Sequence, residues 1–191
     1  NAQAQDAAWE GLKGKKGAVV ALDYTTGAVL AMASSPSYDP NDLASHRLDH
    51  TSQAWKELVA DKSSPLSNRA AREIYAPGST FKLVTAAAAL QNGYTPNSTV
   101  DAPENWILPG TRTPLTNETN CGGKQITLTH ALDISCNTAF GKLGVGLGQD
   151  KIRDQAKQFG FGKVVDSDIS SVASRFPEDL TDAQLAQSSI G

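Results

Sequence analysis

A serine and a lysine three residues apart, Ser79 and Lys82, stand directly after a Pro-Gly pair and open a run of residues that favour helix. Residues 80–90 are rich in strong helix formers, and Asn92-Gly93 provides a stop. Because side chains at this spacing share one helix face a single turn apart, the amine can reach the hydroxyl. The serine oxygen would also lie at the positive end of the helix dipole. This layout predicts an acylating serine whose base is a lysine.

The S-x-x-K pattern alone is also compatible with an N-cap serine followed by a solvated lysine. A second pattern, Ser135-Cys136-Asn137, occurs further along the chain and has the form S-x-N. Serine enzymes that begin with S-x-x-K carry such an element. Taken by themselves, Ser135 and Asn137 could equally be a helix-capping pair. The two motifs together favour the catalytic interpretation.

The composition is that of an ordinary globular domain. The chain has 191 residues, 39% of them apolar and 19% charged, which fits one folded domain. A net charge near −3 gives no reason to expect nucleic acid as a partner. No apolar stretch approaches the roughly 18 residues of a membrane span. The two Asn-x-Ser/Thr matches, at Asn97 and Asn117, are attributed to chance rather than glycosylation.

The pattern of residues predicts a mixed order of helices and strands. Two short strands, at residues 18–22 and 28–32, should be joined by a turn. A long irregular segment rich in Pro, Thr, Asn and Gly is expected at residues 95–124, and such loops often flank functional sites. The S-x-N motif should lie between two helices. The predicted helices are 1–16, 42–48, 53–60, 80–90, 127–133, 138–147 and 151–159.

Two further candidates have a plainer explanation. His46 and His50 stand at i, i+4 spacing and could bind a metal, but no third ligand is evident, so a solvated helix face is favoured. Trp106 could line a substrate groove, although packing beneath a loop is the commoner use of a tryptophan. We therefore predict no metal site and no cofactor.

Several stretches outside the two motifs resemble a known family. The chain is similar to the transpeptidase domain of class B penicillin-binding proteins, and its sequence most resembles their PbpA type. The likeness runs from about Gly17 to the last residue. The stretches that carry it are residues 17–23, 26–32, 36–41, 68–70, 125–140 and 159–162.

The resemblance implies an α/β (α+β) fold of the penicillin-binding transpeptidase and β-lactamase-like type. This fold has an antiparallel five-stranded sheet flanked by helices and an all-helical subdomain. Only two of those strands are expected here, and the family's third motif, Lys-Thr/Ser-Gly, does not occur in the sequence. We therefore interpret residues 1–191 as a partial transpeptidase domain that lacks its C-terminal strands, with residues 1–16 as a helix leading into it.

The resemblance also implies an activity and a role for each motif residue. In a peptidoglycan D,D-transpeptidase, Ser79 would attack the carbonyl between two D-alanines, and Lys82 would have to be neutral to take its proton. Ser135 would relay that proton to the leaving amine, and Asn137 would bind both Lys82 and the substrate amide. The backbone N–H of Ser79 would provide half of the oxyanion hole.

The partners implied are a peptidoglycan stem peptide ending in D-Ala-D-Ala and β-lactam antibiotics, which acylate the same serine. The protein would act at the extracytoplasmic face of the bacterial membrane, in cell-wall synthesis for cell shape or division. A membrane anchor is expected outside this segment. In that oxidising setting Cys121 and Cys136, the two cysteines, would form a disulfide; two buried thiols are the alternative.

Three alternative functions remain open at this stage. A D,D-carboxypeptidase would use water as the acceptor. A serine β-lactamase must activate a deacylating water, but the Glu-x-x-Leu-Asn pattern of one such group is absent. A non-enzymatic β-lactam sensor would acylate once and signal.

Overall fold

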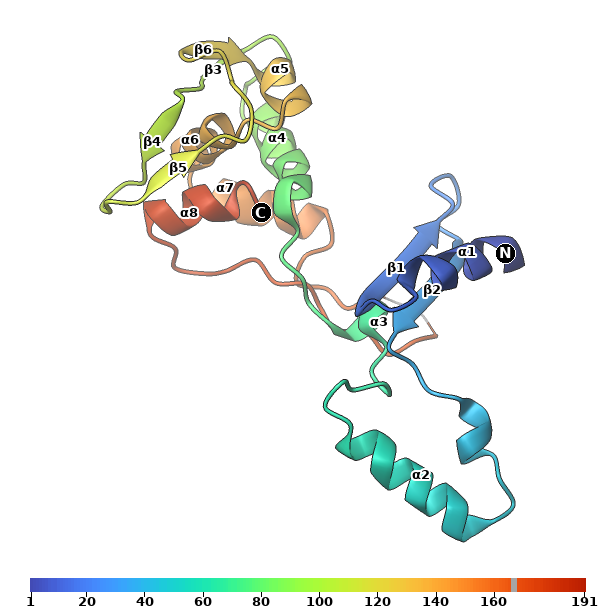
Figure 1. Cartoon of the computed structure of the whole chain (residues 1–191). Coiled ribbons are helices and arrows are strands. Elements are labelled where there is room, and N and C mark those ends of the chain that lie inside the picture. Colours follow the sequence, from blue (N-terminus) through green and yellow to red (C-terminus); the bar gives the residue numbers. More distant parts are fainter. Residues whose placement is uncertain (166–167) are drawn as a thin grey trace. The chain divides into compact units, whose positions relative to one another are not determined.

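The computed structural model describes residues 1–165 and 168–191, which form two compact units (Figure 1). Unit 1 comprises residues 1–74 and the described part of 165–172. Unit 2 comprises residues 75–164 and 173–191. Within the described part of the chain, no helix is both long and apolar enough to cross a bilayer.

Unit 1 is built on an antiparallel hairpin with a helix on one face. The strands pair in the register Val19↔Ala33 and Val20↔Met32. Alternate residues of β2, Ala31 and Ala33, are buried against Ala8 and Leu12 of α1. The elements are α1 (Ala2–Leu12), β1 (Gly17–Leu22), β2 (Val29–Ser35), the 3-10 turn η1 (Pro40–Leu43), α2 (Leu48–Ala60) and α3 (Arg69–Arg72).

The turn between β1 and β2 is closed by Asp23, whose carboxylate accepts hydrogen bonds from the backbone and hydroxyl of Thr25. Those bonds lower the pKa of Asp23, because they favour its charged form. Gly27 completes the turn at φ +76°, a conformation that glycine adopts without a steric penalty. The turn predicted between the two strands is therefore present, with its geometry set by an Asx-type bond.

Arg69 is a buried charged residue of unit 1, with 1% of its surface exposed. Its guanidinium donates to the backbone carbonyls of Pro36, Ser63 and Ser67. Its Nε lies 3.1 Å from a carboxylate oxygen of Glu73. One arginine fork thus joins the end of the hairpin to the segment that precedes α3.

Unit 2 is a cluster of helices packed around α6, with short strand pairs beside them (Figure 1). Helices α4, α7 and α8 contact one another or α6 through a core that includes Phe140 and Ile152, both fully buried. β3 pairs with β6 and β4 with β5, both antiparallel. The elements are η2 (Gly78–Phe81), α4 (Lys82–Gln91), β3 (Thr99–Asp101), β4 (Asn105–Ile107), β5 (Pro114–Thr116), β6 (Gln125–Thr127), α5 (Leu128–Asp133), α6 (Asn137–Leu147), α7 (Gln149–Gln158) and α8 (Asp182–Ser188).

Two glycines of unit 2 lie so close to a neighbouring segment that a side chain would have no room. A Cβ on Gly144 of α6 would overlap the side chain of Ser189, just after α8. A Cβ on Gly191, whose φ is +101°, would overlap the carbonyl group of Gly78. Glycine at these positions therefore lets the end of the chain pack against both α6 and the segment that begins η2.

The fold departs from the sequence prediction at several places, and the short helix α3 and the strand β6 are among the elements that were not predicted. No helix covers residues 42–48; η1 ends at Leu43, and α2 begins at Leu48 and runs on continuously to Ala60. The segment 95–124 is not irregular throughout, because it contributes β3, β4 and β5. Helix α8 has no counterpart in the prediction, although Thr181 and Gln184 form a capping box at its start.

Candidate active site

Ser79 and Lys82 lie one turn apart where η2 passes into α4. The lysine Nζ is 2.9 Å from the serine Oγ. Ser79 belongs to the 3-10 turn and Lys82 is the first residue of the α-helix. The predicted geometry is therefore present, but the serine lies on the tighter turn rather than in the α-helix itself.

The intervening Phe81 faces the other way. It is 3% exposed and lies between two phenylalanines of unit 2. Its ring meets Phe161 edge-on, with centroids 5.5 Å apart, and stacks on Phe176 at 5.7 Å. These contacts fix the orientation of the turn that carries the serine.

Lys82 has no exposed surface, and four oxygen atoms surround its Nζ. Besides Ser79 Oγ, they are Asn137 Oδ1 at 2.7 Å, Ser135 Oγ at 2.8 Å and the backbone carbonyl of Ser135 at 3.0 Å. The structure thus brings together the four residues that the sequence singled out, Ser79, Lys82, Ser135 and Asn137, around a single nitrogen atom.

Burial lowers the pKa of the Lys82 amine, because removal from water disfavours its charged form. The charge of Glu118 acts in the opposite direction and raises that pKa. The burial effect is the larger of the two, so the pKa of Lys82 lies below the ordinary lysine value of 10.5.

Ser135 points two of its oxygens at Lys82 because its backbone adopts an unusual conformation. Its φ is +54°, in the left-handed region, which costs a non-glycine residue about 1 kcal/mol. α5 has just ended at Asp133, and α6 begins at Asn137. The left-handed residue turns the chain sharply between these helices, so its carbonyl and its hydroxyl both face the amine.

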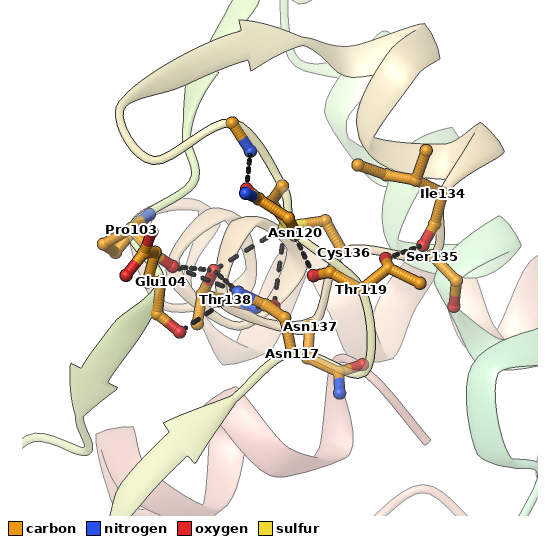
Figure 2. The surroundings of a disulfide bond; sticks show 12 residues. Pro103, Glu104, Asn117, Thr119, Asn120, Ile134, Ser135, Cys136, Asn137 and Thr138 are labelled. Carbon is orange, nitrogen blue, oxygen red and sulfur yellow. Dashed lines mark hydrogen bonds between the residues drawn. A yellow bond between two sulfur atoms is a disulfide. The ribbon is translucent and has the colours of Figure 1, made fainter.

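A disulfide joins Cys121 to Cys136, the central residue of the S-x-N motif. Both cysteines are at most 1% exposed. The bond ties the loop after β5 to the connection between α5 and α6, where Cys136 is labelled in Figure 2. It therefore restrains the two residues on either side of Cys136, Ser135 and Asn137.

Asn117 supports the same segment from the β5–β6 loop (Figure 2). Its Oδ1 accepts a hydrogen bond of 2.9 Å from the backbone N–H of Thr138, in the first turn of α6. Its Nδ2 donates to Thr138 Oγ1 and to the carbonyl of Pro103. Since Cys136 provides no side-chain cap for α6, Asn117 supplies that cap from a distant part of the chain.

The remaining sequence candidates lie elsewhere. His46 and His50 are exposed in unit 1, and the described residues hold no group of three potential metal ligands. Trp106 packs beside Leu108, Ala183 and Ala186, which agrees with the plainer of its two interpretations. The sequence did not reveal Asn117 as a cap, because its one visible signal was the Asn-x-Thr pattern that we attributed to chance.

A buried lysine amine that contacts the hydroxyl of a serine at the start of a helix defines a class of site, the lysine-assisted acylating serine. Comparison with known proteins identifies the family. Residues 17–191 match the sequence model of the penicillin binding protein transpeptidase domain, and the chain belongs to this family.

Relatives of known activity resemble the chain over almost its full length. It is 42% identical to the peptidoglycan D,D-transpeptidase PbpA of Mycolicibacterium smegmatis, over 99% of this chain and 40% of that protein. The chain thus spans about two fifths of the length of that relative.

Solved structures show the same likeness in three dimensions. The imipenem acyl-enzyme complex of penicillin-binding protein A from M. tuberculosis superposes with a TM-score of 0.88 at 43% identity, over 97% of this chain and 44% of that one. The D,D-transpeptidase domain of a peptidoglycan glycosyltransferase from Eggerthella lenta gives 0.83 at 36% identity, over 100% and 45%. These matches confirm the predicted family and fold class.

Proposed function

We propose that this protein is a peptidoglycan D,D-transpeptidase that crosslinks stem peptides ending in D-Ala-D-Ala through an acyl-enzyme on Ser79. β-lactams would acylate the same serine. The proposal rests on the environment of the buried Lys82 amine. Its Nζ lies within 3.0 Å of oxygen atoms of Ser79, Ser135 and Asn137. The names of the matched relatives support the substrate class.

The four oxygens around Lys82 suit a neutral amine. Two of them, the carbonyl of Ser135 and Asn137 Oδ1, can only accept hydrogen bonds. A neutral amine has two N–H groups for these two acceptors and keeps one lone pair. That lone pair can then accept the proton of a hydroxyl, either from Ser79 or from Ser135. The arrangement therefore accommodates the neutral amine that a general base needs, and burial shifts the pKa of Lys82 toward that form.

The proposed reaction follows from these contacts. Ser79 Oγ attacks the carbonyl carbon of the penultimate D-alanine while its proton passes to Lys82 Nζ. The negative charge on the carbonyl oxygen is stabilised by the N–H of Ser79, which lies in the first turn of η2, where backbone donors lack intrahelical partners. Ser135 then passes the proton to the departing D-alanine amine, and the C–N bond breaks. An amine from a second stem peptide finally displaces Ser79.

We further propose that the protein works at the outer face of the bacterial membrane, with an anchor outside residues 1–191. The disulfide between Cys121 and Cys136 supports an oxidising compartment. A D,D-carboxypeptidase, a β-lactamase and a β-lactam sensor are the alternatives, and the experiment below separates the first two from a transpeptidase. A sensor would form the stable adduct but would neither release D-alanine nor crosslink stem peptides.

Intact-mass spectrometry of the whole protein with benzylpenicillin tests the nucleophile. We expect one stable adduct that maps to Ser79, and none on the Ser79→Ala variant. Lys82→Ala should abolish acylation nearly as completely, because the two residues act as a unit. An adduct on another serine would contradict the assignment. Loss of the adduct within minutes would identify a β-lactamase, and release of D-alanine without crosslinking would identify a carboxypeptidase.

The pH dependence of acylation provides a second check. Since the base is active without its proton, the rate should rise with pH as Lys82 loses it. Burial lowers the pKa of Lys82, so the rate should reach its plateau at a pH below the ordinary lysine value of 10.5. A profile that still rises in the range of an ordinary lysine would exclude Lys82 as the neutral base.

A further inference from the structure

The loop between β5 and β6 is fixed to the S-x-N segment on both sides of Glu118. Before it, the carbonyl of Thr116 accepts a hydrogen bond of 3.1 Å from Asn137 Nδ2. After it, the hydroxyl of Thr119 donates to the carbonyl of Ile134 at 3.2 Å, as Figure 2 shows. The disulfide at Cys121 adds a covalent attachment two residues later. The backbone of residue 118 is therefore held beside the catalytic cluster rather than free in a long loop.

Glu118 has no role in holding that loop. Its side chain is exposed, and among the described residues it makes no hydrogen bond or ion pair, unlike its neighbours Asn117 and Thr119. Its backbone is held between the contacts to Asn137 and Ile134. Among the described residues, it is also the carboxylate whose charge raises the pKa of Lys82. A carboxylate that is close enough to act on the buried amine, and is left without a cationic partner, is available to a ligand.

In the second half of the proposed reaction, a positively charged acceptor amine must reach the acyl-enzyme on Ser79, close to Glu118. An aliphatic amine acceptor is mostly protonated near neutral pH. The acceptor must approach the acyl carbon on Ser79 and so must pass close to Lys82. A fixed negative charge at this point would attract the ammonium form and orient it.

We propose that Glu118 binds the ammonium group of the incoming acceptor and so favours an amine over water in resolving the acyl-enzyme. This inference rests on the proposed transpeptidase function. The bound ammonium first gives one proton to solvent. Its nitrogen then forms a bond to the acyl carbon, and the bond from that carbon to Ser79 Oγ breaks. The second proton of the amine passes through neutral Lys82 to Ser79 Oγ, which is restored as a hydroxyl.

The test uses the whole protein, a thioester donor that forms the acyl-enzyme, and two acceptors. D-alaninamide is largely an ammonium ion at neutral pH, whereas hydroxylamine is uncharged. In the Glu118→Gln variant, which keeps the size of the side chain, we expect the KM for D-alaninamide to rise about fivefold, as for the loss of one partly exposed ion pair. The KM for hydroxylamine should stay unchanged.

The same variant should shift the pH profile of acylation to lower pH, because the charge of Glu118 raises the pKa of Lys82. Glu104→Gln is the matched control, since Glu104 is an exposed carboxylate of unit 2 whose charge does not act on Lys82. It should change neither KM nor the pH profile.

Unchanged KM values for both acceptors in Glu118→Gln would show that Glu118 is a solvated surface charge and would overturn the proposal. An equal rise for both acceptors would overturn it as well, because it would indicate a purely structural role. Failure of the proposed function would be seen separately, as an unmodified protein that forms no acyl-enzyme from the donor.

Discussion

Two glycines of α6 allow one substitution to be tested in opposite environments. A Cβ on Gly144 would overlap both the Oγ and the Cβ of the buried Ser189, whereas a Cβ on Gly146 would meet no atom within 4 Å. Replacing an exposed helical glycine by alanine stabilises a protein by about 1 kcal/mol, because alanine loses less backbone entropy on folding. Gly146→Ala should therefore raise the free energy of unfolding by about 1 kcal/mol.

Gly144→Ala gains the same helix propensity but must also displace a rigid neighbour. Overpacking of this kind costs about 1–3 kcal/mol, and the higher value applies here because Ser189 Cβ is not the end of a flexible side chain. The expected net effect is a loss of about 2 kcal/mol in the free energy of unfolding. Removing the obstructing side chain with Ser189→Gly should recover part of this loss in the double variant.

Urea unfolding measures both effects. The chain has three tryptophans, and of these Trp106 lies in unit 2 and packs beside α8. In a background with Trp9→Phe and Trp55→Phe, its fluorescence reports on unit 2 alone. We expect a lower midpoint for Gly144→Ala and a higher one for Gly146→Ala, with unchanged slopes. A stabilising Gly144→Ala would refute the close approach of α6 and Ser189.

Three further predictions follow from the contacts described above. Cys121→Ser should lower the free energy of unfolding by about 3 kcal/mol under non-reducing conditions, because the disulfide closes a loop of 15 residues; the parent protein treated with dithiothreitol should show a similar loss. Arg69→Ala should cost about 2–5 kcal/mol by thermal or urea unfolding, since it empties a fully buried site and removes the donor to the carbonyls of Pro36 and Ser63, whereas the more exposed Arg72→Ala should cost less than 1 kcal/mol. Asn117→Ala should cost about 2 kcal/mol and slow acylation by benzylpenicillin, because the first turn of α6 loses its cap at Thr138; a variant with normal acylation would show that the cap does not position the S-x-N segment.

The helix of the candidate site and the two motifs could be predicted from sequence because they depend on local chemistry. A Pro-Gly pair followed by helix formers sets the position of Ser79 and Lys82, and an i, i+3 spacing on a helix has few possible geometries. The hairpin of β1 and β2 was equally accessible, since its turn is made by neighbouring residues of the chain. These elements need no information from distant parts of the molecule.

The support of the site could not be predicted in the same way. The cap of α6 comes from Asn117, which is 21 residues away from Thr138, and nothing in the sequence pairs the two. The left-handed conformation of Ser135 follows from the meeting of α5, α6 and the disulfide, not from the preference of serine. The short strands within residues 95–124 were missed because each has only three residues, too few for an alternating pattern.

Phe81 anchors the turn that carries Ser79 in the hydrophobic core of unit 2. Its ring packs between Phe161 and Phe176, and Phe81 belongs to the same turn as Ser79, the proposed nucleophile. We expect a change such as Phe176→Leu to loosen the turn that carries Ser79 while Lys82, Ser135 and Asn137 themselves stay unchanged. Such a change should slow every acylating agent alike, the natural donor included, whereas a change at the mouth of the site can discriminate between them. Bacteria under antibiotic selection would gain nothing from the first kind of change, so we expect resistance substitutions in such proteins to spare this aromatic cluster.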